Sequence, residues 1–315
     1  MPLGFVLPGM PPGDMRSFTA RQETMKLSVI IPVWNDPTSL QICLAALALQ
    51  DFPKSDYEVI VADNGSKEPP EALVASFGAR MIVEHMPGSY AARNAAIKQS
   101  RGTILAFTDA DCVPAPNWLR EGVKALEAAG SGVFVGGRID VIPGGEHITP
   151  IELYDQVSTF RQERNIIEGQ YAMTANMFVT VTDFERVGAF SAVLKSGGDS
   201  EWSARAVAAG LKPVYSDQAL VRHPSRGSQA EVFKKLKRLA GGHRDKGPSW
   251  AECMRFTLRH AVPPRRMLID IFSTDPKVAD LSTKTRAFIF AYKCRLYYSW
   301  ARLYLQITGE ASKRA

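Results

Sequence analysis

The chain has 315 residues, of which 45% are hydrophobic and 22% are charged. This is the composition of an ordinary globular protein, long enough for one large domain and a smaller appendage. Its four cysteines lie far apart with no Cys-x-x-Cys pair, which argues against a zinc site and favours buried thiols in a reducing compartment, the cytoplasm. No stretch approaches the ~18 uncharged apolar residues of a membrane-spanning helix, so none is predicted.

The net charge of +6 is distributed unevenly along the chain. Residues 1–228 contain 20 Lys and Arg against 25 Asp and Glu, whereas residues 229–315 contain 18 against 7. A basic C-terminal quarter favours an anionic partner there, for which a membrane surface or nucleic acid are the usual candidates. Because the sequence contains no recognised nucleic-acid-binding module, we do not expect nucleic acid to be the partner.

The chain begins with a segment that does not read as a secretory signal. Residues 1–25 are rich in Pro and Gly and lack a charged start followed by an apolar core, so they are predicted to form a flexible leader. Residues 27–33 are a short apolar run typical of a strand. Asp36 and Pro37 then form a helix start, and apolar residues at helical spacing predict a helix over 37–50.

Strands and helices alternate up to about residue 130. Further strands are predicted at 57–62, 79–84 and 103–108, and helices at 71–77, 88–100 and 118–129. This alternation implies βαβ units, so the predicted fold class is α/β with a mostly parallel sheet and a Rossmann-like nucleotide-binding half. The first strand is not followed by Gly-x-Gly-x-x-Gly or a P-loop, which argues against a nicotinamide or flavin cofactor and against ATP bound in a P-loop.

The pattern changes after residue 130. We predict strands at 134–141 and 173–181, short strands at 214–215 and 219–223, and helices at 151–164, 183–187 and 199–209. A basic amphipathic helix follows at 229–244, and the region 287–307 is rich in aromatic residues with basic residues between them.

Two carboxylates, Asp109 and Asp111, directly follow the strand at 103–108. In an extended segment they point to the same face, at the sheet edge where open α/β folds bind ligands. Two such carboxylates are costly to desolvate unless a cation lies between them, and Mg²⁺ or Mn²⁺ with substrate phosphates is the simplest one. The alternative is that both residues are solvated residues of a turn.

Four further residues are candidates for the same site. Asp63 ends a second strand and can accept hydrogen bonds from a base or ribose, or it can cap a turn. Arg93 lies in the first turns of a helix, where it can meet anionic or ribose groups, or it is a surface arginine. Asp199 follows two glycines and can project into a cleft or merely cap a helix. His223 ends a strand and can supply a third metal ligand or be structural.

In this order, these pieces resemble the family 2 inverting glycosyltransferases, which have the GT-A fold. The matching motifs span about two-thirds of the chain and are Ser28–Asp36, Val61–Ser66, Ala91–Ile97, Phe107–Asp111, Thr174–Phe178 and Gly197–Arg205. The ordered set is specific, whereas the Asp-x-Asp pair alone is not.

The resemblance implies a role for each matching residue. It places the nucleotide sugar against Pro32, Val33, Trp34, Asp36, Asp63, Arg93, Asp109 and Ala110. It implies that Asp111, with Asp109 and His223, binds Mn²⁺ or Mg²⁺ on the diphosphate. Asp199 would be the catalytic base, because an acceptor hydroxyl must lose its proton as it attacks. The acceptor side would contain Asn176, Gly198, Glu201 and Trp202, although the family often has Glu where this chain has Gly198.

The resemblance also divides the chain. It implies a GT-A catalytic domain over 26–228 and a basic, aromatic-rich helical extension over 229–315. The basic helix at 229–244 could lie on an anionic membrane, or its apolar face could dock on the catalytic domain. The aromatic region suits either a lipid headgroup layer or a buried or dimer interface. We therefore expect a cytoplasmic protein, with peripheral contact to the inner face of the plasma membrane and a homodimer as further possibilities.

The predicted activity is metal-dependent, inverting transfer from a UDP- or GDP-type sugar donor to a hydroxyl of a glycan or lipid-linked acceptor. One alternative is a sugar-nucleotide or glycan-binding pseudoenzyme, for which Gly198 is the only support. Another is a sugar nucleotidyltransferase, but that class needs a Gly-rich basic loop after the first strand, where this chain has Trp34–Pro37.

Overall fold

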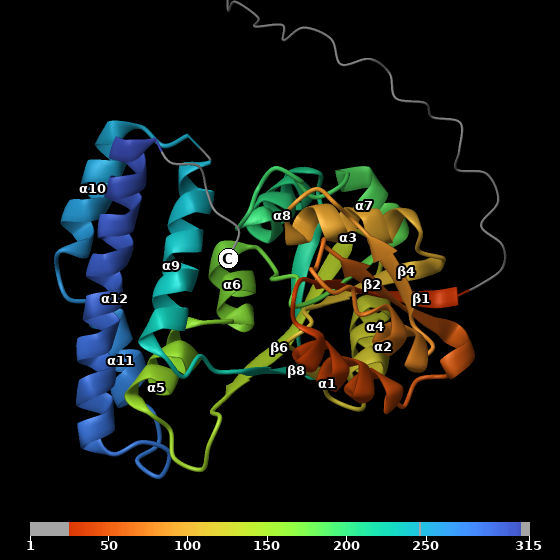
Figure 1. The fold of residues 1–315 in the computed structure, drawn as a ribbon, viewed down its shortest axis with the longest axis horizontal. Helices are drawn as coiled ribbons and strands as arrows, with labels where there is room; N and C mark the ends of the chain where they lie inside the picture. Colours follow the sequence, from red (N-terminus) through yellow and green to blue (C-terminus); the bar gives the residue numbers. More distant parts are fainter. Residues whose placement is uncertain (1–24, 246, 310–315) are drawn as a thin grey trace, which may run out of the picture.

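A computed structural model describes residues 25–245 and 247–309 of the chain (Figure 1). The leader predicted for residues 1–25 lies outside the described residues, except for Met25. The described residues form one eight-stranded sheet, in the order β3-β2-β1-β4-β7-β6-β8-β5. Its strands are β1 (Met25–Val33), β2 (Tyr57–Asp63), β3 (Arg80–Val83), β4 (Gly102–Thr108), β5 (Val113–Pro114), β6 (Val133–Ile142), β7 (Asn176–Thr180) and β8 (Lys212–Pro224).

Helices surround this sheet and form a separate layer beside it (Figure 1). Around the sheet lie α1 (Pro37–Ala48), η1 (Lys54–Asp56), α2 (Glu71–Ser76), α3 (Ser89–Lys98), α4 (Trp118–Ala129), α6 (Gln162–Gly169), α7 (Val181–Val187) and α8 (Gly198–Ala208). The layer contains α5 (Pro150–Ser158), α9 (Gln229–Arg244), α10 (Trp250–His260), α11 (Arg265–Phe272) and α12 (Leu281–Thr308). We call α9 to α12 the C-terminal layer.

The first half of the sheet has the predicted parallel arrangement. Strands β3, β2, β1 and β4 run parallel, joined through α1, α2 and α3. The predicted start of α1 is confirmed, because the Asp36 carboxylate accepts a hydrogen bond from the Ser39 amide at 3.1 Å and Pro37 is the first helical residue. The second half is mixed, since β7 runs antiparallel to β4 and β6, whereas β6 and β8 are parallel.

Hydrophobic cores cover both faces of the sheet. Successive residues of β1 alternate between them, so Val29 and Ile31 pack in one core with α1 and α4, while Ile30 packs in the other with α3, α7 and α8. A parallel sheet buried on both faces explains why its strands read as continuous apolar runs.

Two predicted elements differ from the structure. The helix expected over 151–164 is two helices, α5 and α6, because the chain reverses at Phe160, whose φ is 52°. The two short strands expected at 214–215 and 219–223 are one long strand, β8, with an irregularity in its register opposite Gly137 and Ile139. β8 remains one strand because it pairs with β6 on both sides of this irregularity. Pairing between segments distant in the chain cannot be recognised from local sequence.

In the C-terminal layer, the helix predicted at 229–244 is confirmed as α9, and α12 extends beyond the predicted 287–307. Sequence reasoning missed α10 and α11. The start of α10 does carry a readable signal, since Ser249 and Glu252 form a capping box.

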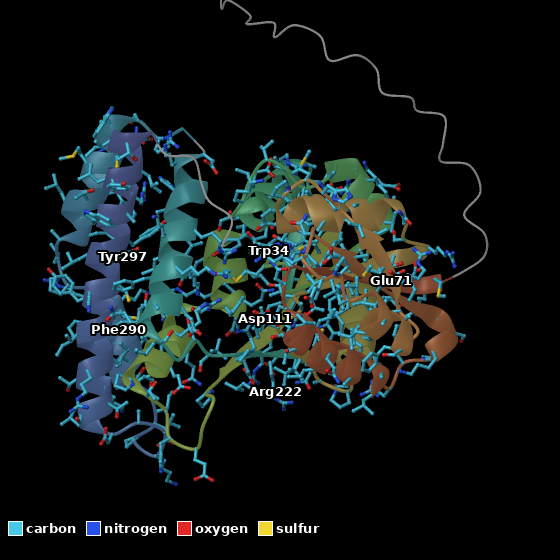
Figure 2. All side chains as sticks on the ribbon, in the orientation of Figure 1. Trp34, Glu71, Asp111, Arg222, Phe290 and Tyr297 are labelled. Atoms are coloured by element: carbon cyan, nitrogen blue, oxygen red, sulfur yellow. The ribbon has the colours of Figure 1, made fainter. Side chains whose placement is uncertain are left out.

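Helix α9 lies between α12 and the sheet domain (Figure 1). Phe233 of α9 stacks on Tyr297 of α12 with ring centroids 4.0 Å apart, and Val232 and Phe233 share a core with Phe290 of α12. Figure 2 labels Tyr297 and Phe290 on α12. The apolar face of α9 therefore docks mainly on α12, so it is not available to a membrane. Among the described residues, no helix is long and apolar enough to cross a bilayer.

Candidate active site

The carboxyl ends of β1, β2 and β4 meet at one edge of the sheet, because the three strands are parallel. Asp109 follows β4 and forms an ion pair with the Nη2 atom of Arg93, which projects from α3 and is buried. Burial raises the pKa of Asp109 above its ordinary value, the charge of Asp111 raises it further, and Arg93 opposes both. Arg93 is therefore not a surface arginine, and its anionic partner in the structure is the carboxylate of Asp109.

Asp111 lies against His223 at the end of β8. The Asp111 Oδ2 and His223 Nε2 atoms are 3.1 Å apart, although the two residues are far apart in sequence. Burial alone would raise the pKa of Asp111, but the hydrogen bond and charge of His223, together with Arg226, lower it. The imidazole ring also packs on Phe160, at 4.4 Å between ring centroids.

The orientation of His223 fits a divalent cation at this position. Its Nδ1 atom lies 2.6 Å from the carbonyl oxygen of Pro224, which can only accept, so Nδ1 carries the proton. Nε2 is then the ring nitrogen that points at Asp111 Oδ2, and a bound cation would engage these two atoms in place of their mutual contact. Metal-binding histidines commonly donate their other N–H to a backbone carbonyl in this way.

The protein by itself supplies few ligands. No cluster of three or more His, Cys, Asp or Glu side chains in the described ranges forms a complete metal site. This number of ligands suits Mg²⁺ or Mn²⁺, which are bound by one or two carboxylates and complete their shell with substrate phosphates and water. Of the three predicted ligands, Asp111 and His223 are the pair in contact and would hold the ion, whereas Asp109 is ion-paired with Arg93.

Asp199 lies in the first turn of α8, and Tyr90 connects it to the other carboxylates. The Tyr90 hydroxyl donates a hydrogen bond to Asp199 Oδ1 at 3.3 Å, and the Arg93 guanidinium packs over the Tyr90 ring at 5.6 Å. Arg93 in turn pairs with Asp109. The structure therefore connects Asp199 to Asp109 through Arg93 and Tyr90, a residue that sequence reasoning missed.

Tyr90 also explains the departure at Gly198. A Cβ atom at Gly198 would lie 2.7 Å from the Tyr90 ring, so a larger residue there would displace the tyrosine. The Tyr90 ring thus occupies the space that a side chain at position 198 would need, which gives Gly198 a packing role in this chain.

Asp63 is buried at the end of β2 with an unused acceptor. Its Oδ2 atom accepts from the Ser66 amide at 3.0 Å, while Oδ1 has no hydrogen-bond partner among the described residues. A buried carboxylate oxygen without a partner is costly, so a hydroxyl or N–H of a bound ligand would stabilise it. Asp36 differs, because its carboxylate already caps α1.

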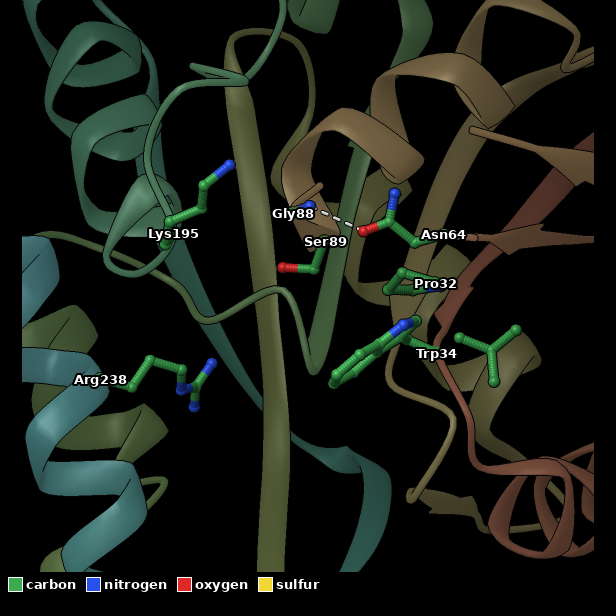
Figure 3. A pocket seen from close by; sticks show the side chains of 8 residues that line it. Pro32, Trp34, Asn64, Gly88, Ser89, Lys195 and Arg238 are labelled. Carbon is green, nitrogen blue, oxygen red and sulfur yellow. Dashed lines mark hydrogen bonds between the residues drawn. The ribbon is translucent and has the colours of Figure 1, made fainter. Parts of the chain in front are cut away.

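Next to Asp63 lies a pocket of about 150 Å³ (Figure 3). Its walls are Pro32, Val33, Trp34, Asn64, Gly88, Ser89, Lys195 and Arg238. The Asn64 Oδ1 atom accepts from the Gly88 amide at 2.7 Å and fixes the start of α3 against β2. Sequence analysis predicted the first three of these residues and missed Asn64, Gly88, Ser89, Lys195 and Arg238.

The residues predicted on the acceptor side have structural roles here. Trp202 is wholly buried in the core, and its indole N–H donates to the Gly188 carbonyl. Asn176 is also wholly buried, and its side chain ties together α4, β6 and β8 through Trp118 and two backbone carbonyls. Neither side chain therefore lines a surface where an acceptor could bind.

Glu201 and Ala110 complete the predicted set. Glu201 forms an ion pair with Arg205 one turn along α8, at 2.6 Å. Ala110 is buried between Asp109 and Asp111.

Comparisons with known proteins agree with this arrangement. The model of glycosyl transferase family 2 matches residues 28–188. Glycosyltransferase AglE of Haloferax volcanii is 39% identical over 224 residues, which are 69% of this chain and 72% of AglE.

Two solved structures share the fold. The mannosyltransferase PcManGT of Pyrobaculum calidifontis, in complex with GDP-Man and Mn²⁺, superposes with a TM-score of 0.60 and 17% identity, over 92% of this chain and 89% of its own. Staphylococcus aureus TarS 1–349, in complex with UDP, gives 0.51 and 18%, over 92% and 93%. These likenesses confirm the predicted GT-A-type sheet, and with the family match they establish that the chain is a glycosyltransferase of family 2.

Proposed function

We propose that this protein transfers a sugar from a nucleotide-diphosphate donor to an acceptor hydroxyl by direct, inverting displacement. The observation that carries the proposal is the chain of contacts from Asp109 through Arg93 and Tyr90 to Asp199, with Asp111 two residues beyond Asp109. The ligands of the two structural neighbours, GDP-Man and UDP, support a GDP- or UDP-type sugar donor.

The donor would lie along the carboxyl edge of the sheet. The free Oδ1 atom of Asp63 would accept a hydrogen bond from the base or ribose, and Trp34 would pack against the nucleoside. Arg93 holds Asp109 in place from α3. Mn²⁺ or Mg²⁺ bound to Asp111 and His223 would act as a Lewis acid on the diphosphate.

Asp199 would take the proton of the acceptor hydroxyl. The Tyr90 hydroxyl donates to Asp199 Oδ1 and so orients the carboxylate, leaving Oδ2 to meet the acceptor. As the acceptor oxygen bonds to the anomeric carbon, the bond from that carbon to the β-phosphate oxygen breaks, and the configuration inverts.

Two substitutions separate the roles. Asp199→Asn should retain donor binding and lose turnover by about 10²–10⁴-fold, because the base is lost while the donor side is intact. Asp111→Ala should weaken metal-dependent donor binding. Calorimetric titration with UDP- and GDP-sugars, with and without Mn²⁺, and a coupled assay of nucleotide release would measure both effects.

Asp217→Asn, on an exposed residue of β8, is the matched control and should leave both quantities unchanged. Sugar transfer at the normal rate by Asp199→Asn would show that the base has been assigned wrongly.

The proposed acceptor is a glycan or a lipid-linked glycan, and the outer face of α12 supports a membrane contact. Ile289 and Trp300 there are 63% and 54% exposed, with exposed Arg286 and Lys293 between and beside them. Apolar and cationic side chains on one helical face complement an anionic bilayer surface. The buried, unpaired thiols of all four cysteines support a cytoplasmic location.

A further inference from the structure

One face of α9 is turned toward the active site. Lys235, Arg238 and Gly242 are spaced three and four residues apart, so they lie along one side of the helix. Lys235 donates a hydrogen bond to Thr159 at 2.7 Å and packs over the ring of Phe160, which itself stacks on His223. This end of the face therefore adjoins the residues that we propose bind the metal.

The other end of this face contacts the loop that carries the proposed base. A Cβ atom added at Gly242 would lie 2.8 Å from both the side chain and the carbonyl oxygen of Ser196, three residues before Asp199. Helix α9 can approach this closely only because the residue is glycine. The face thus extends from the neighbourhood of Asp111 to that of Asp199.

Arg238 lies on this face between Lys235 and Gly242. It lines the same pocket as Trp34, Ser89 and Lys195, and it faces Trp34 across that pocket (Figure 3). Its Nε atom is buried without a hydrogen-bond partner, and no described carboxylate forms an ion pair with it. Arg226 and Lys235, by contrast, both pair with Asp155. A partly buried guanidinium with no counter-charge is costly, and an anionic ligand would remove that cost.

We infer that Arg238 binds the phosphate groups of the nucleotide donor and stabilises the leaving nucleoside diphosphate. None of the residues lining the pocket is acidic, and two are cationic. A planar guanidinium matches phosphate oxygens with paired N–H donors. The inference rests on the proposed function. Under that function, the bond from the anomeric carbon to the β-phosphate oxygen would lie between Asp199 and the residues proposed to bind the metal.

In that step, the acceptor proton passes to Asp199 and the electron pair of the breaking bond passes to the β-phosphate oxygen. The diphosphate gains negative charge as the sugar departs. The N–H groups of Arg238 would donate to its oxygens from the side opposite the sheet, without any transfer of a proton from Arg238.

The test uses the full-length protein with Arg238→Gln, Arg238→Lys and the adjacent exposed control Lys237→Gln. Each is titrated with UDP and GDP by calorimetry and with uridine and guanosine by ligand-observed NMR. For Arg238→Gln we expect about a 10- to 100-fold loss of nucleoside diphosphate affinity, which is the value of a charge-assisted hydrogen bond. The affinity for nucleosides should be unchanged, Arg238→Lys should recover part of the loss, and Lys237→Gln should match the wild type.

Two results would overturn the inference, and a third would reject the proposed function. Diphosphate affinity at the wild-type level in Arg238→Gln would overturn the inference. An equal loss of nucleoside and nucleoside diphosphate affinity would assign Arg238 a purely structural role and overturn it as well. A wild-type protein that binds neither UDP nor GDP would reject the proposed function first, and the inference with it.

Discussion

Two regions of the molecule carry opposite charges, and we call them the acidic and the basic wall. The acidic wall, at the carboxyl edge of the sheet and the start of α8, contains Asp63, Asp109, Asp111 and Asp199. The basic wall, from residue 226 into α9, contains Arg226, Lys235 and Arg238. A cation-bound diphosphate needs both kinds of group, since carboxylates hold the ion and guanidinium groups match phosphate oxygens. The family model ends at residue 188, so the acidic wall lies mostly within it and the basic wall lies beyond it.

The walls also differ in how completely their charges are paired. Asp63 and Arg238 each keep a buried polar atom without a partner among the described residues. Asp155, which is 1% exposed, has Arg226, Lys235 and Thr159 as partners, and its pKa is lowered because these partners outweigh the opposing effect of burial. The unpartnered atoms of Asp63 and Arg238 thus lie beside or in the lining of the pocket, while the paired cluster around Asp155 joins α5 to α9.

The largest expected effect is a loss of stability when the ion-paired cluster around Asp155 is broken. Asp155→Ala leaves two cations, Arg226 and Lys235, without their shared carboxylate, so it should lower the free energy of unfolding by about 3–5 kcal/mol. Urea denaturation followed by circular dichroism would measure the loss.

The control for this prediction is Asp140→Ala, which breaks the half-exposed pair between Asp140 and Arg138. That change should cost less than about 1 kcal/mol. Equal losses in the two variants would show that the buried cluster does not hold α5 and α9 together.

The next effect is a dependence of stability on pH. Burial, and secondarily the charge of Arg226, lower the pKa of Lys235 to about 7, although Asp155 opposes them. Between pH 7 and the ordinary lysine pKa, the unfolded chain holds a proton that the folded protein has released. Stability should therefore rise with pH, by about 1.5 kcal/mol from pH 7 to 8.5 for this group.

Lys235→Met should remove this part of the slope. Denaturation midpoints at several pH values between 7 and 8.5 would compare the two proteins, since groups common to both cancel in the difference. Parallel profiles for the variant and the wild type would show that Lys235 keeps its proton in the folded state.

A smaller effect is expected where α9 meets the loop before Asp199. Gly242→Ala places a methyl group against the side chain and carbonyl oxygen of Ser196, so the loop must shift and turnover should fall by roughly three- to tenfold. Gly227→Ala is the control, because a Cβ there meets nothing within 4 Å. Unchanged turnover in Gly242→Ala would mean that α9 does not position the loop.

The smallest effect concerns the outer surface of the C-terminal layer. Replacing Ile289 and Trp300 with Asn and Ser should weaken flotation with anionic liposomes by roughly tenfold, because exposed apolar area is removed. Leu49→Asn, on an equally exposed residue at the end of α1, should not change flotation. If the double variant floats as well as the wild type, this face of α12 does not contact the bilayer.

Sequence reasoning recovered those parts of the site that lie in locally recognisable segments. The parallel half of the sheet followed from short apolar runs separated by helices, and Asp109, Asp111 and Asp63 followed from their positions at strand ends. It could not show that Asn176 and Trp202 are wholly buried, since a motif gives the chain neighbourhood of a residue but not its burial.

The sequence by itself therefore determined the order of elements and the positions of the acidic side chains, because hydrophobic periodicity and strand ends are local properties. The tertiary structure alone decided that Tyr90 connects Arg93 to Asp199, that His223 meets Asp111, and that Arg238 of α9 lines the same pocket as Trp34. These contacts join residues distant in the chain, and the packing of whole elements selects them.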